Sequence, residues 1–165
     1  MSRLARFISI AVVGLGIAAL VIGVAFVVEG QSKANYIKKS MQEEQVSLAA
    51  LGIEGVDSTN LIDSAAEAQE AADLVKEHRH RIAATYADLM AMSPSGRYDP
   101  TIPAHLSYAQ ALNLENYLYL GVASLGLTTV TIISGISMIV TGLALGLIGL
   151  AVWRVAMKVP VAAHG

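Results

Sequence analysis

The longest uncharged stretch of the chain runs from Asn116 to Trp153. Glu115 is the last charged residue before it and Arg154 is the first after it, so 38 consecutive residues carry no formal charge. The hydrocarbon core of a bilayer is about 30 Å thick and needs roughly 20 helical residues to cross it. The stretch therefore predicts a transmembrane helix that is longer than one bilayer and extends out of it.

A second apolar stretch lies near the N-terminus, from Phe7 to Val28. Its 22 uncharged residues match one bilayer at helical rise. It is longer than the core of a signal peptide, about 7–15 residues, and the sequence Val28-Glu29-Gly30 is a poor cleavage site. We interpret it as a retained anchor, with a cleaved signal peptide as the alternative. A hydrophobic content of 55% with 15% charged residues also favours a membrane protein.

The charges predict the orientation of both spans. All 13 acidic residues lie between Glu29 and Glu115, so the two tails are purely basic. Short basic flanks stay on the cytoplasmic side, which places both termini inside and the acidic middle of the chain outside. The predicted membrane-interface anchors are the basic tail residues and the tryptophan beside them: Arg3, Arg6, Trp153, Arg154 and Lys158.

Two helices are predicted between the spans. Ser32–Leu51 is rich in Lys, Gln, Glu and Ala and predicts a helix that continues outward from the first span. A second helix is predicted to end at Met92. It starts at Ser58 or at Ser64, where Glu67 completes the spacing of a capping box. Its apolar stripe is predicted to contain Ala71, Val75, Ile82, Tyr86 and Leu89, with His78 on the same face.

The chain then breaks and resumes. Residues 93–100 (SPSGRYDP) predict a loop, and Pro103 suits the first turn of a helix that runs unbroken into the second span. The predicted fold is an all-α membrane protein, with two transmembrane helices that extend out of the bilayer and are joined by an extracytoplasmic helical hairpin. The predicted parts are a cytoplasmic tail (1–6), transmembrane helix 1 (7–28), an extracytoplasmic helical region (29–116), an outer helix continuing into transmembrane helix 2 (117–153) and a second cytoplasmic tail (154–165).

Both spans carry small residues at helical spacing. A stripe of small residues lets another helix approach closely in lipid. Residues 142–146 form a G-x-x-x-G motif. The stripe of one span can pack on the other span of the same chain. The remaining small residues therefore predict a further helix partner. Seven hydroxyl residues between Ser124 and Thr141 add side chains that hydrogen-bond between helices. The predicted packing residues are Gly16, Ala19, Gly23, Gly135, Gly142, Gly146 and Gly149.

No pattern in the sequence predicts catalysis. The carboxylates are spaced like a solvated helix face rather than a dry pair, and the chain has no cysteine for a thiolate–zinc site or a nucleophile. His78 and His80 lie on different helix faces, so His78 and His105 are only weak metal candidates. No cofactor is expected. The net charge of −2, with an acidic middle segment, does not indicate a nucleic-acid-binding surface.

One predicted outer helix resembles a known family. Ala68-Gln69, Ala72-Asp73-Leu74-Val75-Lys76-Glu77-His78 and Thr85-Tyr86-Ala87-Asp88-Leu89 are similar to segments of small bacterial two-span membrane proteins of unknown function. Those proteins are often mislabelled as aromatic ring-opening dioxygenases, enzymes that need iron held by histidines and a carboxylate; no such ligand set is found here. The resemblance implies the two-span architecture and the bacterial cytoplasmic (inner) membrane, and it supplies no catalytic residue.

These features predict a non-catalytic accessory or structural subunit of a larger integral-membrane complex. The spans would pack on other integral-membrane subunits through their glycine-rich faces, with lipid around the remainder, and the outer helices would brace the extracytoplasmic side. Two alternatives stay open: a self-assembling homo-oligomeric membrane protein, and an extracytoplasmic sensor or metal-handling module built on His78 and His105.

Overall fold

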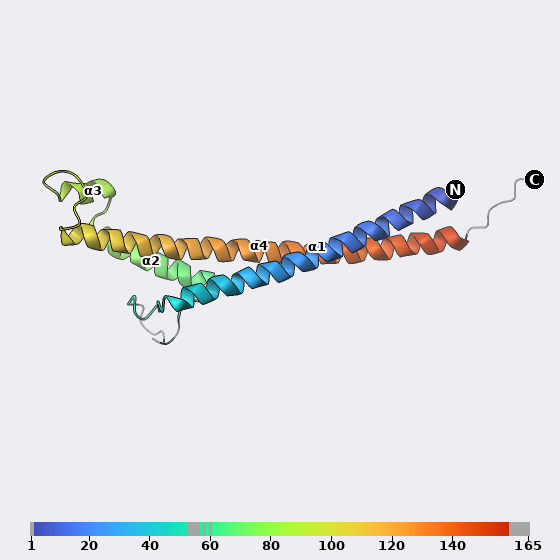
Figure 1. The fold of residues 1–165 in the computed structure, drawn as a ribbon, viewed down its shortest axis with the longest axis horizontal. Helices are drawn as coiled ribbons and strands as arrows, with labels where there is room; N and C mark the ends of the chain where they lie inside the picture. The colour runs from blue at the N-terminus through green and yellow to red at the C-terminus, as the bar shows by residue number, and fades with distance from the viewer. Residues whose placement is uncertain (1, 53–56, 58, 60, 159–165) are drawn as a thin grey trace, which may run out of the picture. The chain divides into compact units, whose positions relative to one another are not determined.

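The computed structural model describes residues 2–52, 57, 59 and 61–158, with side chains from Arg6 to Met157. These residues form four helices and no strand (Figure 1), which confirms the all-helical fold. The helices are α1 (Ser2–Glu43), α2 (Ala65–Ile82), α3 (Tyr86–Ala91) and α4 (Pro103–Lys158).

The chain divides into two compact units. Unit 1 comprises residues 1–33 and 128–165, of which the structure describes the first part of α1 and the last part of α4. Unit 2 comprises residues 34–127, with α2, α3 and the remaining parts of α1 and α4. Each unit has its own kind of helix packing.

Two helical stretches, Arg6–Glu43 and Pro103–Met157, are long and apolar enough to cross a membrane. Only 11% of the most apolar part of the first and 17% of that of the second is buried. A core helix of a water-soluble protein would be mostly buried, because exposed apolar surface is unfavourable in water. The two stretches therefore suggest a membrane protein.

In unit 1 the two helices run antiparallel, as Figure 1 shows, and are buried at every seventh residue. A repeat of seven is typical of helices that stay in contact over several turns by supercoiling. The buried positions hold only small residues: Ser9, Gly16, Gly23 and Gly30 on α1, and Thr128, Gly135, Gly142 and Gly149 on α4.

Unit 2 has an alanine-rich core. Ala68, Ala71 and Ala72 of α2 are fully buried, which lets this helix lie close to its neighbours. Around them are buried Ala34, Met41, Leu48, Ile62, Val75, Leu118 and Leu125. A second, smaller cluster consists of Ala83, Leu89 and Tyr108.

α2 begins where the sequence predicted. The Ser64 side chain accepts a hydrogen bond from the backbone N–H of Glu67 at 3.2 Å, and the Glu67 carboxylate accepts one from the N–H of Ser64 at 3.2 Å. These are the two bonds of a capping box, which satisfy N–H groups that have no partner inside the helix. The predicted start at Ser64 is confirmed.

The predicted run to Met92 is wrong, because α2 ends at Ile82. Ala83 is extended, with φ −152° and ψ 131°. A second capping box, between Thr85 and Asp88, then starts α3. A threonine side chain that bonds the backbone in this way favours a helix start over a helix interior.

The first outer helix is also shorter than predicted, because α1 ends at Glu43 and not at Leu51. The chain reverses at Gln45, whose φ is +53°. The backbone N–H of Ile62 then donates to the carbonyl of Val46 at 3.0 Å, and Leu48 and Ile62 become buried. A helix continued to residue 51 would lose that backbone pairing.

Other predictions on the backbone are confirmed. No helix crosses residues 93–100, where Gly96 has a φ of +63°, and α4 starts at Pro103 and continues without a break to Lys158. The turn predicted around residues 53–60 lies largely outside the described residues.

Candidate functional site

The glycines of unit 1 lie where two backbones meet. A Cβ atom on Gly16 would lie 2.8 Å from the carbonyl oxygen of Gly142, and one on Gly142 would lie 2.6 Å from that of Gly16. A Cβ on Gly23 or on Gly135 would likewise lie 2.7 Å from the carbonyl oxygen of the other. These distances are shorter than van der Waals contact, so only glycine fits without moving the helices.

Gly30 and Gly149 extend the same contact. A Cβ on Gly30 would lie 2.7 Å from Cγ1 of Ile132, and one on Gly149 would lie 2.6 Å from Cγ2 of Val13. The sequence analysis missed Ser9, Gly30 and Thr128 as members of this row. Their signal was the interval of seven residues, which already relates Gly16 to Gly23 and Gly135 to Gly142 and Gly149 in the predicted set.

Gly146, which was predicted as a packing residue, lies outside this seven-residue row. A Cβ there would meet nothing within 4 Å, although its backbone nitrogen would lie 2.9 Å from a Cβ on Gly16. Ala19 is half-buried. In the G-x-x-x-G pair, therefore, only Gly142 requires the absence of a side chain. The two glycine stripes face each other within unit 1, so the surplus stripe that predicted a further partner is taken up inside the chain.

Two of the hydroxyl residues bond to their own helix. Ser137 Oγ donates to the carbonyl of Ile133 at 3.0 Å, and Thr141 Oγ1 donates to that of Ser137 at 2.9 Å. Bonds of this kind satisfy a hydroxyl in an apolar setting without a second helix. Both bonds lie within α4, whereas the hydroxyl residues were predicted to bond between helices.

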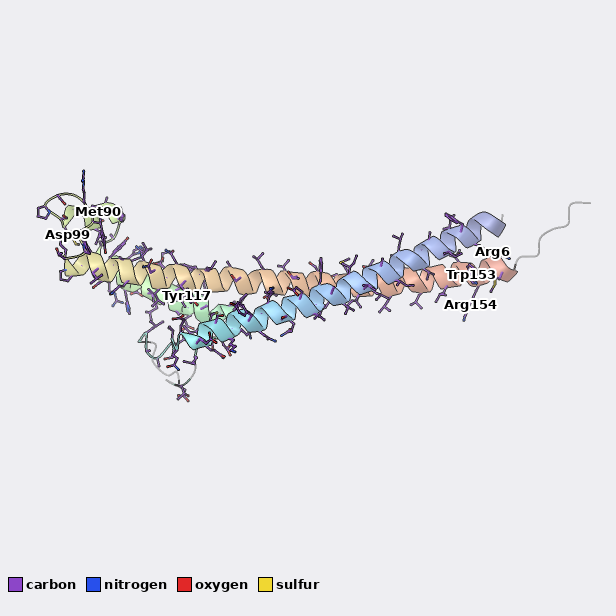
Figure 2. All side chains as sticks on the ribbon, in the orientation of Figure 1. Arg6, Met90, Asp99, Tyr117, Trp153 and Arg154 are labelled. Carbon is purple, nitrogen blue, oxygen red and sulfur yellow. The ribbon has the colours of Figure 1, made fainter. Side chains whose placement is uncertain are left out.

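The predicted anchors Arg6, Trp153 and Arg154 lie at the same end of unit 1 (Figure 2). Both arginines are exposed and Trp153 is half-buried. The side chains of Arg3 and Lys158, the other two predicted anchors, lie outside the described part of the chain.

Unit 2 contains a buried ion pair that the sequence analysis missed. Arg79 Nε donates to Glu115 Oε2 at 2.6 Å, and its Nη2 donates to Oε1 at 3.3 Å, so that the guanidinium grips the carboxylate with two nitrogens. Arg79 also donates to the hydroxyl of Tyr108 at 2.5 Å. The exposed fractions of these three residues are 8%, 6% and 4%.

The ion pair joins α2 to α4, and both of its charged groups are hydrogen-bonded. The hydrogen bond to Glu115 is the main cause that raises the pKa of Arg79 above its usual value, so the arginine keeps its proton. The arrangement therefore links the two helices through a charged, two-nitrogen contact.

The sequence analysis placed the wrong residue of α2 in the interior. His78 is exposed, and its neighbour Arg79 is buried. The buried residues of α2 are Ala68, Ala71, Ala72, Val75 and Arg79. Arg79 continues the spacing of residues 68, 72 and 75, at intervals of four, three and four. That spacing was visible in the sequence, but an arginine is counted as a surface residue unless its partner is known. Tyr86, assigned to the same stripe, is 59% exposed.

His105 is fully buried, and both of its ring nitrogens are engaged. Nδ1 accepts the backbone N–H of Asp99 at 2.9 Å, so Nε2 carries the proton and donates to the carbonyl of Leu89 at 2.8 Å. The ring of Tyr98 stacks on it, with centroids 5.5 Å apart. His105 thus ties the 93–102 loop to α3. No group of three or more metal-ligating side chains occurs among the described residues.

A second polar link between α2 and α4 lies at the surface of unit 2. Tyr119 Oη donates to Asp73 Oδ1 at 2.7 Å, and Gln69 Nε2 donates to Oδ2 at 3.0 Å. The bond from Gln69, followed by that from Tyr119, lowers the pKa of Asp73 below its ordinary value. The same bond to Asp73 raises the pKa of Tyr119.

Unit 2 also exposes large apolar side chains. Four of them lie in α3, at its C-terminal cap, in the following loop and in the first turn of α4. Figure 2 labels Met90 of α3 and Asp99 of the loop. We call these four residues the aromatic cap: Tyr86 (59% exposed), Met92 (46%), Tyr98 (41%) and Leu106 (44%).

Comparisons with known proteins give no match. No family model fits the chain, and searches of curated proteins and of solved structures find no similar protein. The resemblance to the two-span bacterial family consequently stays a prediction.

Proposed function

We propose that the protein is a non-catalytic accessory or structural subunit of a larger integral-membrane complex. It would lie in the bacterial cytoplasmic (inner) membrane with both termini in the cytoplasm and residues 29–116 outside. The purely basic tails support this orientation, and the low burial of both apolar stretches supports insertion in lipid.

The aromatic cap is the observation that carries the proposed role. Single exposed apolar residues are ordinary on a protein surface, but two tyrosines and a methionine together with a leucine match the composition of protein interfaces. All four side chains are exposed, by between 41% and 59%. The exposed parts of these side chains are available to a partner subunit.

The partner contact differs from the one expected from the sequence. The glycine stripes support the pairing of the chain's own two helices, so substitution of Gly142 by leucine would separate those helices before it affected any partner. The proposed contact is instead made by the aromatic cap on the outer side and by the lipid-facing surface of the spans.

The proposal is tested by purifying the tagged protein from native membranes in mild detergent and identifying everything that co-purifies by mass spectrometry. Large multi-span subunits in stoichiometric amounts are the expected result. Tyr86→Ser combined with Met92→Ser should reduce their recovery about tenfold or more, as loss of an interface hot spot does.

Tyr36→Ser is the matched control, since Tyr36 is 71% exposed and lies outside the cap. It should leave recovery unchanged. Equal recovery with the cap variant would remove the cap from the interface. Recovery of the protein alone, as one defined oligomer that also forms when it is expressed by itself and cross-linked, would replace the proposal with self-assembly.

A further inference from the structure

A pocket of about 210 Å³ opens between the two helices at one end of unit 1. Ser9, Ile10 and Val13 of α1 line it on one side, and Leu150 and Trp153 of α4 line it on the other. Apart from Ser9 the lining side chains are large and apolar. A space of this size and character suits part of a hydrocarbon chain.

Two arginines continue the pocket's lining toward the end of the helices. Arg6 precedes Ser9 by three residues and Ile10 by four, and Arg154 follows Leu150 by four. Residues three or four apart lie on the same helix face, one turn from each other. Figure 2 shows Arg6 and Arg154 at this same end, with Trp153.

No acidic side chain of the chain's own ends can neutralise these arginines. Neither residues 1–28 nor residues 116–165 contain an aspartate or a glutamate. Arg6 and Arg154 are both exposed. Their charges therefore remain available to a ligand that carries negative charge next to a hydrocarbon chain.

We propose that this pocket binds an anionic phospholipid of the bilayer. One acyl chain occupies the space between Val13 and Leu150, and the headgroup phosphate is held by Arg6 and Arg154. Arginine is suited to this role because its planar guanidinium offers paired N–H donors to phosphate oxygens. Trp153 marks the depth at which headgroups begin, and the cytoplasmic leaflet is rich in anionic lipids. The site rests on the membrane placement proposed above and adds a ligand to it.

Native mass spectrometry of the full-length protein in detergent tests the site. The probes are palmitoyl-oleoyl phosphatidylglycerol and phosphatidylcholine with the same chains. The expected result is one retained phosphatidylglycerol per protein and no comparable retention of phosphatidylcholine. Arg6→Gln and Arg154→Gln should each weaken retention about fivefold, and both together about thirtyfold. Arg97→Gln, which removes a basic residue from unit 2, is the control and should have no effect.

A second pair of variants separates a built site from simple charge attraction. Leu150→Trp fills the pocket without changing the charge and should abolish retention, whereas Leu147→Trp, at a position 69% exposed and outside the pocket, should not. Equal retention of the two lipids, or retention that survives Leu150→Trp, would overturn the proposal. Co-purification of partner subunits reports on the accessory role separately, so failure of the lipid site and failure of that role give different results.

Discussion

Unit 1 brings its helices together through residues with almost no side chain, whereas unit 2 adds to its alanine-rich core a buried pair of long charged side chains. In unit 1 Gly16 and Gly142 let two backbones touch. In unit 2 Arg79 reaches from α2 to Glu115 on α4. The two solutions suit two solvents. In lipid there is no hydrophobic force between helices, so close packing must hold them. In water the alanine-rich core drives association, and a polar pair can fix how the helices are aligned.

The two units should therefore respond to different kinds of substitution. Unit 1 is sensitive to added volume at positions where the natural residue has no side chain. Unit 2 is sensitive to the loss of one charge of a pair, because the remaining charge stays buried without compensation. Three predictions test this difference.

The largest effect is expected from Glu115→Leu in unit 2. It leaves the Arg79 guanidinium buried without its carboxylate, and breaking a buried pair in this way lowers the free energy of unfolding by about 3–5 kcal/mol. Hydrogen exchange of peptides from α2, measured on the full-length protein in detergent, should show the loss of protection.

Glu77→Leu provides the control for this variant. Glu77 pairs with Arg81 on the same helix at 2.7 Å, but both side chains are well exposed, at 63% and 65%. Exposed pairs of this kind contribute about 0–1 kcal/mol. The double variant Arg79→Met with Glu115→Leu should recover most of the stability, because no lone charge remains. If Glu115→Leu proves as mild as Glu77→Leu, the buried pair does not hold α2 on α4.

A smaller effect is expected from Gly142→Ala in unit 1. The new Cβ would meet the Gly16 carbonyl oxygen, and overpacking of this kind costs about 1–3 kcal/mol. Gly146→Ala is a control in the same G-x-x-x-G motif: its Cβ meets nothing, so stability should stay the same or rise slightly with helix propensity. Thermal unfolding in detergent, followed by circular dichroism, compares the two. Equal destabilisation would mean that both glycines face the other helix.

The parts of the fold that were predictable depend on signals within a few residues. The start of α2 at Ser64 and that of α4 at Pro103 follow from local backbone chemistry, which acts whatever the rest of the chain does. Thr85 and Asp88 have the same capping spacing as Ser64 and Glu67, so the break before α3 could have been found there. The end of α1 could not, because it depends on Val46 pairing with Ile62 across the intervening turn.

The candidate site was less predictable, because the packing and burial of its residues depend on which residues of another helix contact them. Gly16 and Gly142 could be recognised as packing residues, but only the structure shows that they pack on each other. His78 and Arg79 are adjacent, and burial of the arginine is favourable only because Glu115, 36 residues away, meets it. Pairing over such a distance leaves no local trace in the sequence.

The smallest effect concerns acid, and it separates the two units most cleanly. In unit 2, hydrogen bonds from Gln69 and then from Tyr119 lower the pKa of Asp73 below its ordinary value of 3.8. A carboxyl whose pKa is lowered by folding stabilises the fold when it is ionised, and that stabilisation is lost as the pH falls from about 4 through the folded-state pKa. The stretches 7–28 and 128–153 contain no ionisable side chain, so they have no carboxyl whose titration would change their stability.

All six tyrosines lie in unit 2 and the single tryptophan, Trp153, lies in unit 1. Near-ultraviolet circular dichroism of the tyrosines should therefore change below about pH 4 while Trp153 fluorescence stays constant, and Asp73→Asn should remove part of the tyrosine change. A simultaneous shift of Trp153 emission would show that acid acts on both units alike, and the contrast between their modes of packing would not extend to their response to pH.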